Sequence, residues 1–302
     1  MQPDQERADR EGFYSHCWRV FSAYTVADGV LRGSGDTLRE YAPAAYPQII
    51  TQLANLCEGD EIALVKFAST WGHLGYLEAV LFDESLSDEK RTEAYADVTA
   101  LRGSDPLHWI WAHARGSRMC LELLYYLKRE DDDALDRYIQ SVWHAGQSLL
   151  SDKQPDVLDR VAWPVIPYGE RNRLRSVVYV GPMDAWRPCD VARSIILDIV
   201  NSNLPTVRPH LDIVEGSKLI LGQYSPNLLG IAYWHLARMV VSELGLARCL
   251  ECKRYFHQTD KRQDYCPPDE WEAENARKRG MSVESRCAKR ARMRRLRQKS
   301  AQ

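Results

Sequence analysis

The feature that most constrains this chain is a set of four cysteines confined to its last fifth. Their spacing is C-x2-C-x13-C-x20-C, beginning at Cys249 and ending at Cys287. Four thiolates can close a tetrahedral shell around one zinc ion, and a shell of this kind is structural rather than catalytic. The sequence therefore predicts one Zn²⁺ per chain. Its predicted ligands are Cys249, Cys252, Cys266 and Cys287.

Two alternatives to this ligand set stay open. Four unrelated buried thiols are one, although half of the eight cysteines fall in a polar segment that has little core to bury them. His257 is the other, because it lies five residues after Cys252 and could replace Cys266 or Cys287. No apolar leader precedes the body of the chain, so we expect a reduced, cytoplasmic protein with no membrane partner.

The charge of the chain is divided unevenly. Residues 248–302 carry 16 Lys and Arg against 8 Asp and Glu, while the other 247 residues carry 24 against 34. From Arg286 to Lys299 there are eight bases and no acid, so a helix there repels itself unless an anion neutralises it. Phosphates do this well, and the alternative is a solvated basic tail. The predicted nucleic-acid contacts are Lys289, Arg290, Arg292, Arg294, Arg295 and Arg297, with Lys253 and Arg254 beside the first two cysteines.

The long gap before the last cysteine also has a pattern. Residues 268–280 carry acids at their start and bases at their end, and they stop at Gly280. This arrangement suits the dipole of a short helix. We therefore expect a compact helical insertion that lets Cys287 return to the metal, followed by a helix over residues 288–299.

The rest of the chain predicts a mainly α fold with a small β element, an α+β protein. Apolar residues recur at helical spacing in five segments. In residues 155–225 prolines are frequent and short β-prone pieces appear, of which 211–214 and 219–222 can pair as a hairpin. Residues 195–200 suit a strand or a short helix equally. Ser225 and Pro226 suit the start of a further helix that reaches about Leu244. The five helical segments are 45–57, 62–82, 87–101, 106–128 and one that ends near 150.

The C-terminal motifs resemble a known family. The order Arg-Cys-x-x-Cys-x-x-Tyr-Phe, then Tyr-Cys, then Arg-Cys-Ala-Lys-Arg is similar to the CGNR-type zinc finger of bacterial proteins regarded as transcription regulators. The resemblance implies that the four cysteines hold the metal in a treble-clef-like knuckle, and that Tyr255 and Phe256 pack beneath it. Ala288 and Lys289 replace the Gly and Asn of the family motif, and the spacer before Cys287 is longer than usual.

A fainter likeness covers residues 66–75, which are similar to a stretch in the helical, regulatory region of such proteins. We therefore expect two domains. Residues 1–247 would form an α-rich regulatory or ligand-sensing body with a β-prone middle over about 160–224. Residues 248–302 would form the zinc finger and its basic helix.

The function expected from these features is binding of nucleic acid, with DNA preferred to RNA, by a transcription regulator. No phosphate-binding loop and no hydrolase or metalloprotease motif occurs, so an enzyme is not expected. A protein-interaction module that grips an acidic partner is the first alternative, and a protein acting on RNA is the second. The segment that contains His108 and His113 either lines a pocket for an acidic ligand or is a packed helix with a polar edge. The sequence leaves open a homodimer, the identity of any small-molecule effector and the target sequence.

Overall fold

The computed structural model describes most of the chain, and the polypeptide divides into two compact units. Unit 1 is Met1–Arg238 and unit 2 is Met239–Gln302. No helix in the described part of the chain is long and apolar enough to cross a bilayer. The described residues are 18–81, 103–150, 160–165, 175–178, 187–204, 207–214, 218–268, 273, 276–278 and 283–300.

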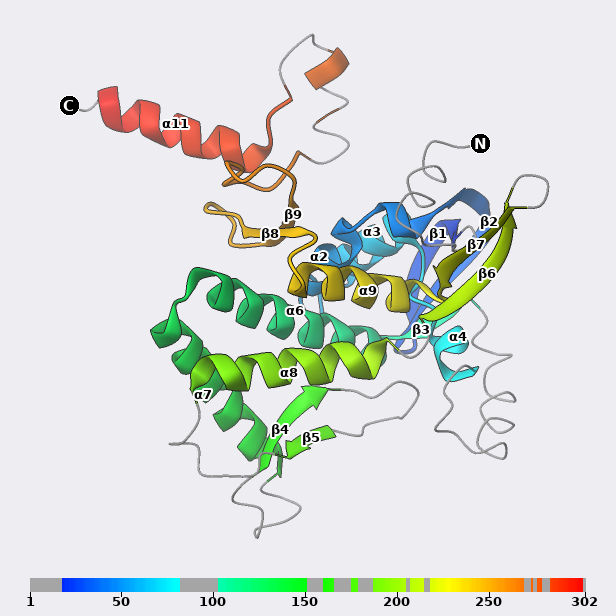
Figure 1. Ribbon diagram of the computed structural model, residues 1–302. Helices are drawn as coiled ribbons and strands as arrows, with labels where there is room; N and C mark the ends of the chain where they lie inside the picture. The colour runs from blue at the N-terminus through cyan, green and yellow to red at the C-terminus, as the bar shows by residue number, and fades with distance from the viewer. Residues whose placement is uncertain are drawn as a thin grey trace. The chain divides into compact units, whose positions relative to one another are not determined.

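The structure confirms an α+β fold, because helices dominate and the sheets are small and antiparallel (Figure 1). In unit 1 the longest helices are α6 (Leu107–Arg129), α7 (Asp132–Leu150) and α8 (Pro188–Asn203). Helices α6 and α7 correspond to the helical segments expected over 106–128 and ending near 150, whereas α8 includes residues 195–200, which suited a strand or a short helix equally. The expected helix over 87–101 lies outside the described residues.

The first element of unit 1 is a hairpin that the sequence analysis did not predict. Strands β1 (Trp18–Ala27) and β2 (Val30–Tyr41) pair in antiparallel fashion, and β3 (Ser104–Pro106) pairs with the start of β2. Asp28 and Gly29 connect the strands with φ of 53° and 73°, the positive values that a tight two-residue hairpin turn needs. In β2 only Leu31 and Tyr41 are buried, so the alternation of apolar and polar residues that reveals a strand is missing.

The prediction of one continuous helix over 62–82 is wrong. The structure has two helices there, α3 (Glu61–Trp71) and α4 (Tyr76–Leu81). Gly72 and Gly75 lie between the two helices with φ of 89° and 90°. Residues with a side chain rarely adopt this backbone conformation, whereas glycine does so readily. The intervening loop is fixed by Asp105, a fully buried residue of β3 whose carboxylate accepts hydrogen bonds from the backbone N–H groups of residues 74, 75 and 76.

The core of unit 1 gathers around α6. Helix α2 (Gln48–Ala54) packs on it, and Arg118 of α6 donates to the backbone oxygens of Ala54, the last residue of α2, and of Leu56, two residues later. Helix α8 also packs against α6. It includes residues 195–200, so this segment is helical and not a strand. The bulkiest side chains of this core are fully buried. They include Tyr233, Leu31, Ile49, Ile50, Leu53, Leu64, Leu74, Ile110, Leu121 and Leu123.

One histidine of α6 is part of this core. His113 is 2% exposed, and its Nδ1 lies 3.2 Å from the hydroxyl of Tyr233 on α9 (Leu228–Val240). The ring packs edge-on against Trp109, and its Nε2 has no hydrogen-bond partner among the residues that the structure describes. Burial favours the neutral imidazole and lowers the pKa of His113 from 6.5 to about 3. Of the two alternatives for this segment, a ligand pocket and a packed helix, His113 therefore fits the packed helix.

The β-prone middle of unit 1 contains two hairpins. Strand β4 (Arg160–Val165) pairs with β5 (Arg175–Val178). Strand β6 (Arg208–Val214) pairs with β7 (Lys218–Tyr224), which confirms the hairpin expected over 211–222.

The helix expected from Ser225 to about Leu244 begins later and ends earlier than predicted. Helix α9 starts at Leu228, and the side chain of Asn227 caps it by accepting from the N–H of Gly230. Ser225 instead donates its hydroxyl to the backbone oxygen of Asn227. After Val240 the chain turns at Ser242, whose φ is 66°. Asn227 rather than Ser225 caps the helix because it directly precedes Leu228, the position from which a side chain reaches the first free N–H groups.

Unit 2 contains a short hairpin and one long helix. Strands β8 (Gly245–Arg248) and β9 (Tyr255–Gln258) pair in antiparallel fashion, and the basic helix is α11 (Arg286–Ser300). Of the insertion predicted as a helix over 268–280, residues 273 and 276–278 are helical, and most of the others lie outside the described residues.

Candidate metal centre and basic helix

The structure brings the four C-terminal cysteines together. Their sulfur atoms all lie within 4.8 Å of one another. A tetrahedral zinc site with Zn–S bonds of about 2.3 Å places its sulfurs about 3.8 Å apart, so a small contraction would complete the shell. The four cysteines are therefore close enough to hold one metal ion. His257, the alternative ligand, is not part of this cluster.

The first two candidate ligands, Cys249 and Cys252, lie on a tight turn between β8 and β9. The N–H of Cys249 donates to the oxygen of Arg254 over 2.9 Å, and the N–H of Lys253 donates back to Cys249 over 3.0 Å. Lys253 adopts a φ of 60°, which reverses the chain. Its ammonium group donates to the oxygen of Leu250. Lys253, predicted as a nucleic-acid contact, thus also stabilises the turn that presents Cys249 and Cys252.

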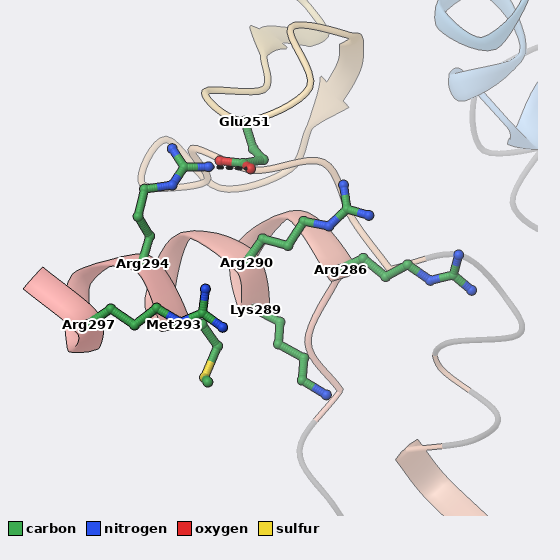
Figure 2. Close-up of a pocket in the computed structure, with 7 residues that line it drawn as sticks. All are labelled: Glu251, Arg286, Lys289, Arg290, Met293, Arg294 and Arg297. Carbon is green, nitrogen blue, oxygen red and sulfur yellow. Dashed lines mark hydrogen bonds and ion pairs between the residues drawn. The ribbon is translucent and has the colours of Figure 1, made fainter.

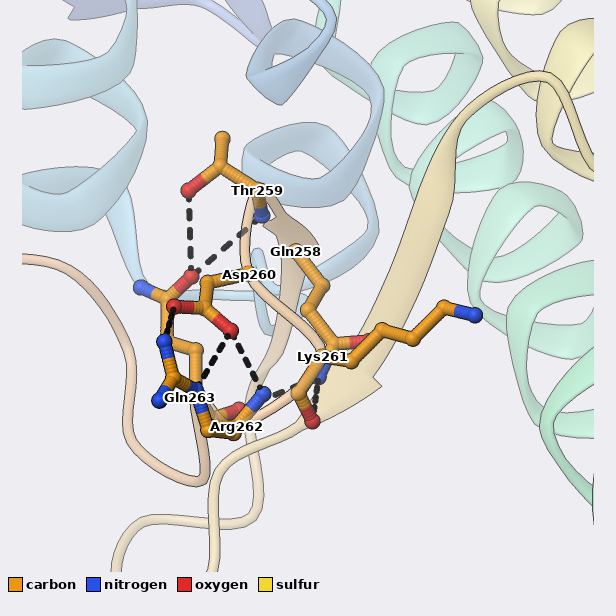
Figure 3. A network of polar contacts seen from close by, with 6 residues as sticks. All are labelled: Gln258, Thr259, Asp260, Lys261, Arg262 and Gln263. Atoms are coloured by element: carbon orange, nitrogen blue, oxygen red, sulfur yellow. Dashed lines mark hydrogen bonds and ion pairs between the residues drawn. The ribbon is translucent and has the colours of Figure 1, made fainter.

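An ordered loop that begins at Thr259 connects β9 to Cys266, the third candidate ligand, and brings it back to the turn; Figure 3 shows the polar contacts of this loop. The carboxylate of Asp260 accepts from the backbone N–H of Arg262 over 2.9 Å and also from its guanidinium group. Gln263 bonds through its side chain to the backbone and hydroxyl of Thr259. The loop then runs beside the knuckle, where Leu250 donates to Asp264 over 3.0 Å. Cys266 follows two residues later.

The fourth ligand is the second residue of α11. Ser285 caps this helix, because its hydroxyl accepts from the N–H of Ala288 over 3.2 Å. Cys287 is 9% exposed and packs with Cys249 and Phe256 in a small core that Tyr265 and Cys266 also contact. The first turn of the basic helix is therefore attached directly to the cysteine cluster.

The electrostatics of the cluster favour a bound cation. Burial raises the pKa of Cys249, but the N–H groups of residues 252, 266 and 251 facing its sulfur outweigh burial and lower the pKa to about 7. Burial and the neighbouring thiols raise the pKa of Cys287 to about 11 and raise that of Cys266 as well. Four sulfurs this close become thiolates together only when a cation neutralises them.

Two predicted nucleic-acid contacts on α11 form ion pairs within unit 2. Arg294 lies 2.7 Å from Glu251, and Arg292 lies 2.9 Å from Glu284. Figure 2 shows Arg294 pointing at Glu251, whereas Lys289 extends away from the knuckle. The sequence analysis did not identify Glu251 or Glu284 as residues that organise the helix.

The remaining predicted bases fall in three places. Arg295 lines the side of α11 that faces Leu250 and Tyr265. Lys289, Arg290 and Arg297 line an open groove of about 470 Å³ between α11 and Glu251. Arg254 lies at the end of the knuckle turn and is exposed.

Comparison with protein-family models, with curated proteins and with solved structures finds no match for this chain.

Proposed function

We propose that residues 248–302 form a zinc-stabilised module that binds nucleic acid, and that the protein is a DNA-binding transcription regulator. The observation that supports this most strongly is that the basic helix begins at a metal ligand. Cys287 is the second residue of α11. From Arg286 to Lys299 this helix carries eight Lys or Arg and no acid. A metal ion at the four sulfurs would thus hold a cationic helix in a fixed direction.

The composition of the site favours zinc as the metal. Four thiolates in a tetrahedron suit Zn²⁺, and they leave no open position for a substrate. One ion per chain is the stoichiometry that one cluster gives. The proposed module therefore binds rather than catalyses, and a reduced, cytoplasmic setting would keep its thiols available for the metal.

The order of a two-cysteine turn, a hairpin and a ligand at the start of a helix is that of a treble-clef-like knuckle. This order agrees with the resemblance to CGNR-type zinc fingers. Tyr255 and Phe256 are each 4% exposed, as expected for an aromatic pair under the knuckle. We propose that residues 248–302 belong to this family and adopt its treble-clef fold.

The dimensions of α11 suit a DNA duplex. Its 15 residues give a length of about 22 Å at 1.5 Å per residue. An α-helix is about 10–12 Å across with its side chains, and the major groove of B-DNA is about 12 Å wide. Each base that neutralises a phosphate releases condensed counterions. We therefore propose that DNA is bound mainly through its phosphates, with RNA as a weaker alternative.

A substitution series tests the proposal. Replacing Arg290, Arg295 and Arg297 by Gln in the zinc-loaded full chain should weaken binding to a mixed-sequence duplex on the order of 100-fold at 0.1 M salt, because three phosphate contacts are lost. The matched control replaces three exposed bases of unit 1, Arg32, Lys66 and Arg137, by Gln. Fluorescence anisotropy should show near-native affinity for the control, and equal losses in both variants would contradict the proposal.

A protein-interaction module is the second candidate function. It is favoured by the exposure of large apolar side chains on the same unit, with Leu250 at 54%, Leu296 at 53% and Met293 at 44%. A basic helix with exposed apolar residues can bind an acidic, amphipathic partner segment. Unaltered DNA binding in the substituted helix, together with competition by an acidic peptide, would favour this candidate.

A further inference from the structure

Two bases of α11 form ion pairs with acids of unit 2, Arg294 with Glu251 and Arg292 with Glu284. The side chain of Glu251 is 14% exposed, whereas that of its partner Arg294 is 63% exposed. A carboxylate with so little contact with water depends on its ion pair, because an unpaired buried charge is unfavourable. Glu251 also lies between two metal ligands, Cys249 and Cys252. The pair therefore connects the knuckle to the third turn of the helix.

This pair and the metal ligand lie on one face of the helix. Cys287 and Arg294 are seven residues apart, which is close to two turns, so both face the knuckle. Arg292 forms the other internal pair, with Glu284 just before the helix. The helix is thus held at its first turn by Cys287 and two turns later by Arg294.

A different set of bases forms a continuous flank of α11. Arg286, Lys289, Arg290 and Arg297 are spaced i, i+3, i+4 and i+11, and all four line the open groove. Arg294 also lines this groove, but it forms an ion pair with Glu251 there. The flank extends over about 16 Å of the helix. Its first three bases lie in the opening turns, where the helix dipole disfavours positive charge and favours an approaching anion.

We propose that two sets of bases on α11 have different roles, an inference that rests on the nucleic-acid-binding function proposed above. The flank formed by Arg286, Lys289, Arg290 and Arg297 contacts the phosphates of the nucleic acid. Arg292 and Arg294 are positioning residues, which hold α11 against Glu284 and Glu251 and contribute few phosphate contacts of their own. Binding then depends on which bases are present and not only on how many.

Two charge-matched double variants of the zinc-loaded full chain test this division. The flank variant is Lys289→Gln with Arg297→Gln, and the positioning variant is Arg292→Gln with Arg294→Gln. Each removes two positive charges and keeps every cysteine. The measurement is the slope of log K against log salt for a mixed-sequence duplex, because this slope counts neutralised phosphates. Circular dichroism and zinc content establish that both variants are folded.

The flank variant should reduce the magnitude of the slope by about 1.8, that is, by about 0.9 for each lost phosphate contact. The positioning variant should weaken binding while the slope changes by less than about 0.5. If the positioning variant loses helix, Arg292→Lys with Arg294→Lys replaces it, because this change keeps the charge and removes the planar guanidinium group. This second variant should keep the native slope but bind more weakly, because the positioning pairs are lost; native affinity would contradict the positioning role.

Three outcomes would overturn the division. Equal slope changes in the two variants would mean that binding depends on total charge, and nucleic-acid binding would still stand. Competition by polyglutamate as effective as that of the duplex would assign the flank to acidic protein segments. Absence of duplex binding by the unaltered, zinc-loaded chain would refute the proposed function itself and this inference with it.

Discussion

Stripping the metal from this protein should unfold unit 2 and leave unit 1 folded. The core of unit 2 consists largely of the ligands themselves, since Cys249, Cys287 and Phe256 form its buried cluster. Burying Tyr255 and Phe256 contributes only about 2–3 kcal/mol each, whereas ordering each residue opposes folding by about 1–2 kcal/mol. Structural zinc supplies about 10–16 kcal/mol in comparable small modules. The expected result is therefore loss of the hairpin and of α11.

The measurement combines elemental analysis with circular dichroism before and after a chelator. We expect one zinc per chain, and we expect Cys266→Ser to lose both the metal and the helical signal of α11. Cys57→Ser is the matched control, because Cys57 is an exposed, free cysteine of unit 1. It should retain zinc and fold normally. A metal-free chain in which unit 2 keeps its structure would contradict the metal assignment.

The second large effect concerns the acid sensitivity of unit 1. The folded chain keeps His113 neutral down to a pKa of about 3, whereas the unfolded chain takes up this proton near 6.5. The stability that comes from the neutral ring is therefore complete above pH 6.5 and is lost as the pH falls toward 3. The loss should approach about 1.4 kcal/mol for each pH unit within that window.

Urea unfolding followed by tryptophan fluorescence measures this effect, because eight of the nine tryptophans precede residue 239. His113→Asn keeps a polar group near the hydroxyl of Tyr233 but cannot titrate. This variant should be less stable at pH 7, yet its stability should fall less steeply between pH 6.5 and 5 than that of the native chain. Parallel curves for the two proteins would refute the role of His113.

The elements that the sequence predicted well are those with a strong local signal. Helices α6 and α7 have apolar residues at regular helical spacing, and the hairpin of β6 and β7 was expected from the β-prone pieces at 211–214 and 219–222. The two-residue separation of Cys249 and Cys252 predicted that these two thiols face one metal, whereas the long gaps before Cys266 and Cys287 left alternatives to the ligand set open. These features depend on residues close together in the sequence.

The elements that were missed depend on contacts between distant residues. The hairpin of β1 and β2 has an exposed, polar second strand, so its sequence lacks the alternation that marks strands. The break between α3 and α4 is fixed by Asp105, which lies about 30 residues away from the loop it binds. The Glu251–Arg294 pair spans 43 residues. Periodicity along the chain cannot reveal such partners.

The most direct test of the central claim is the salt dependence of duplex binding by the zinc-loaded, unaltered chain. If α11 is a metal-held helix that contacts phosphates with four to eight of its bases, log K should fall linearly with log salt, with a slope between about −3 and −7. The chelated protein should lose this binding. An affinity that does not change between 50 and 200 mM salt, or that is the same with and without metal, would contradict the account.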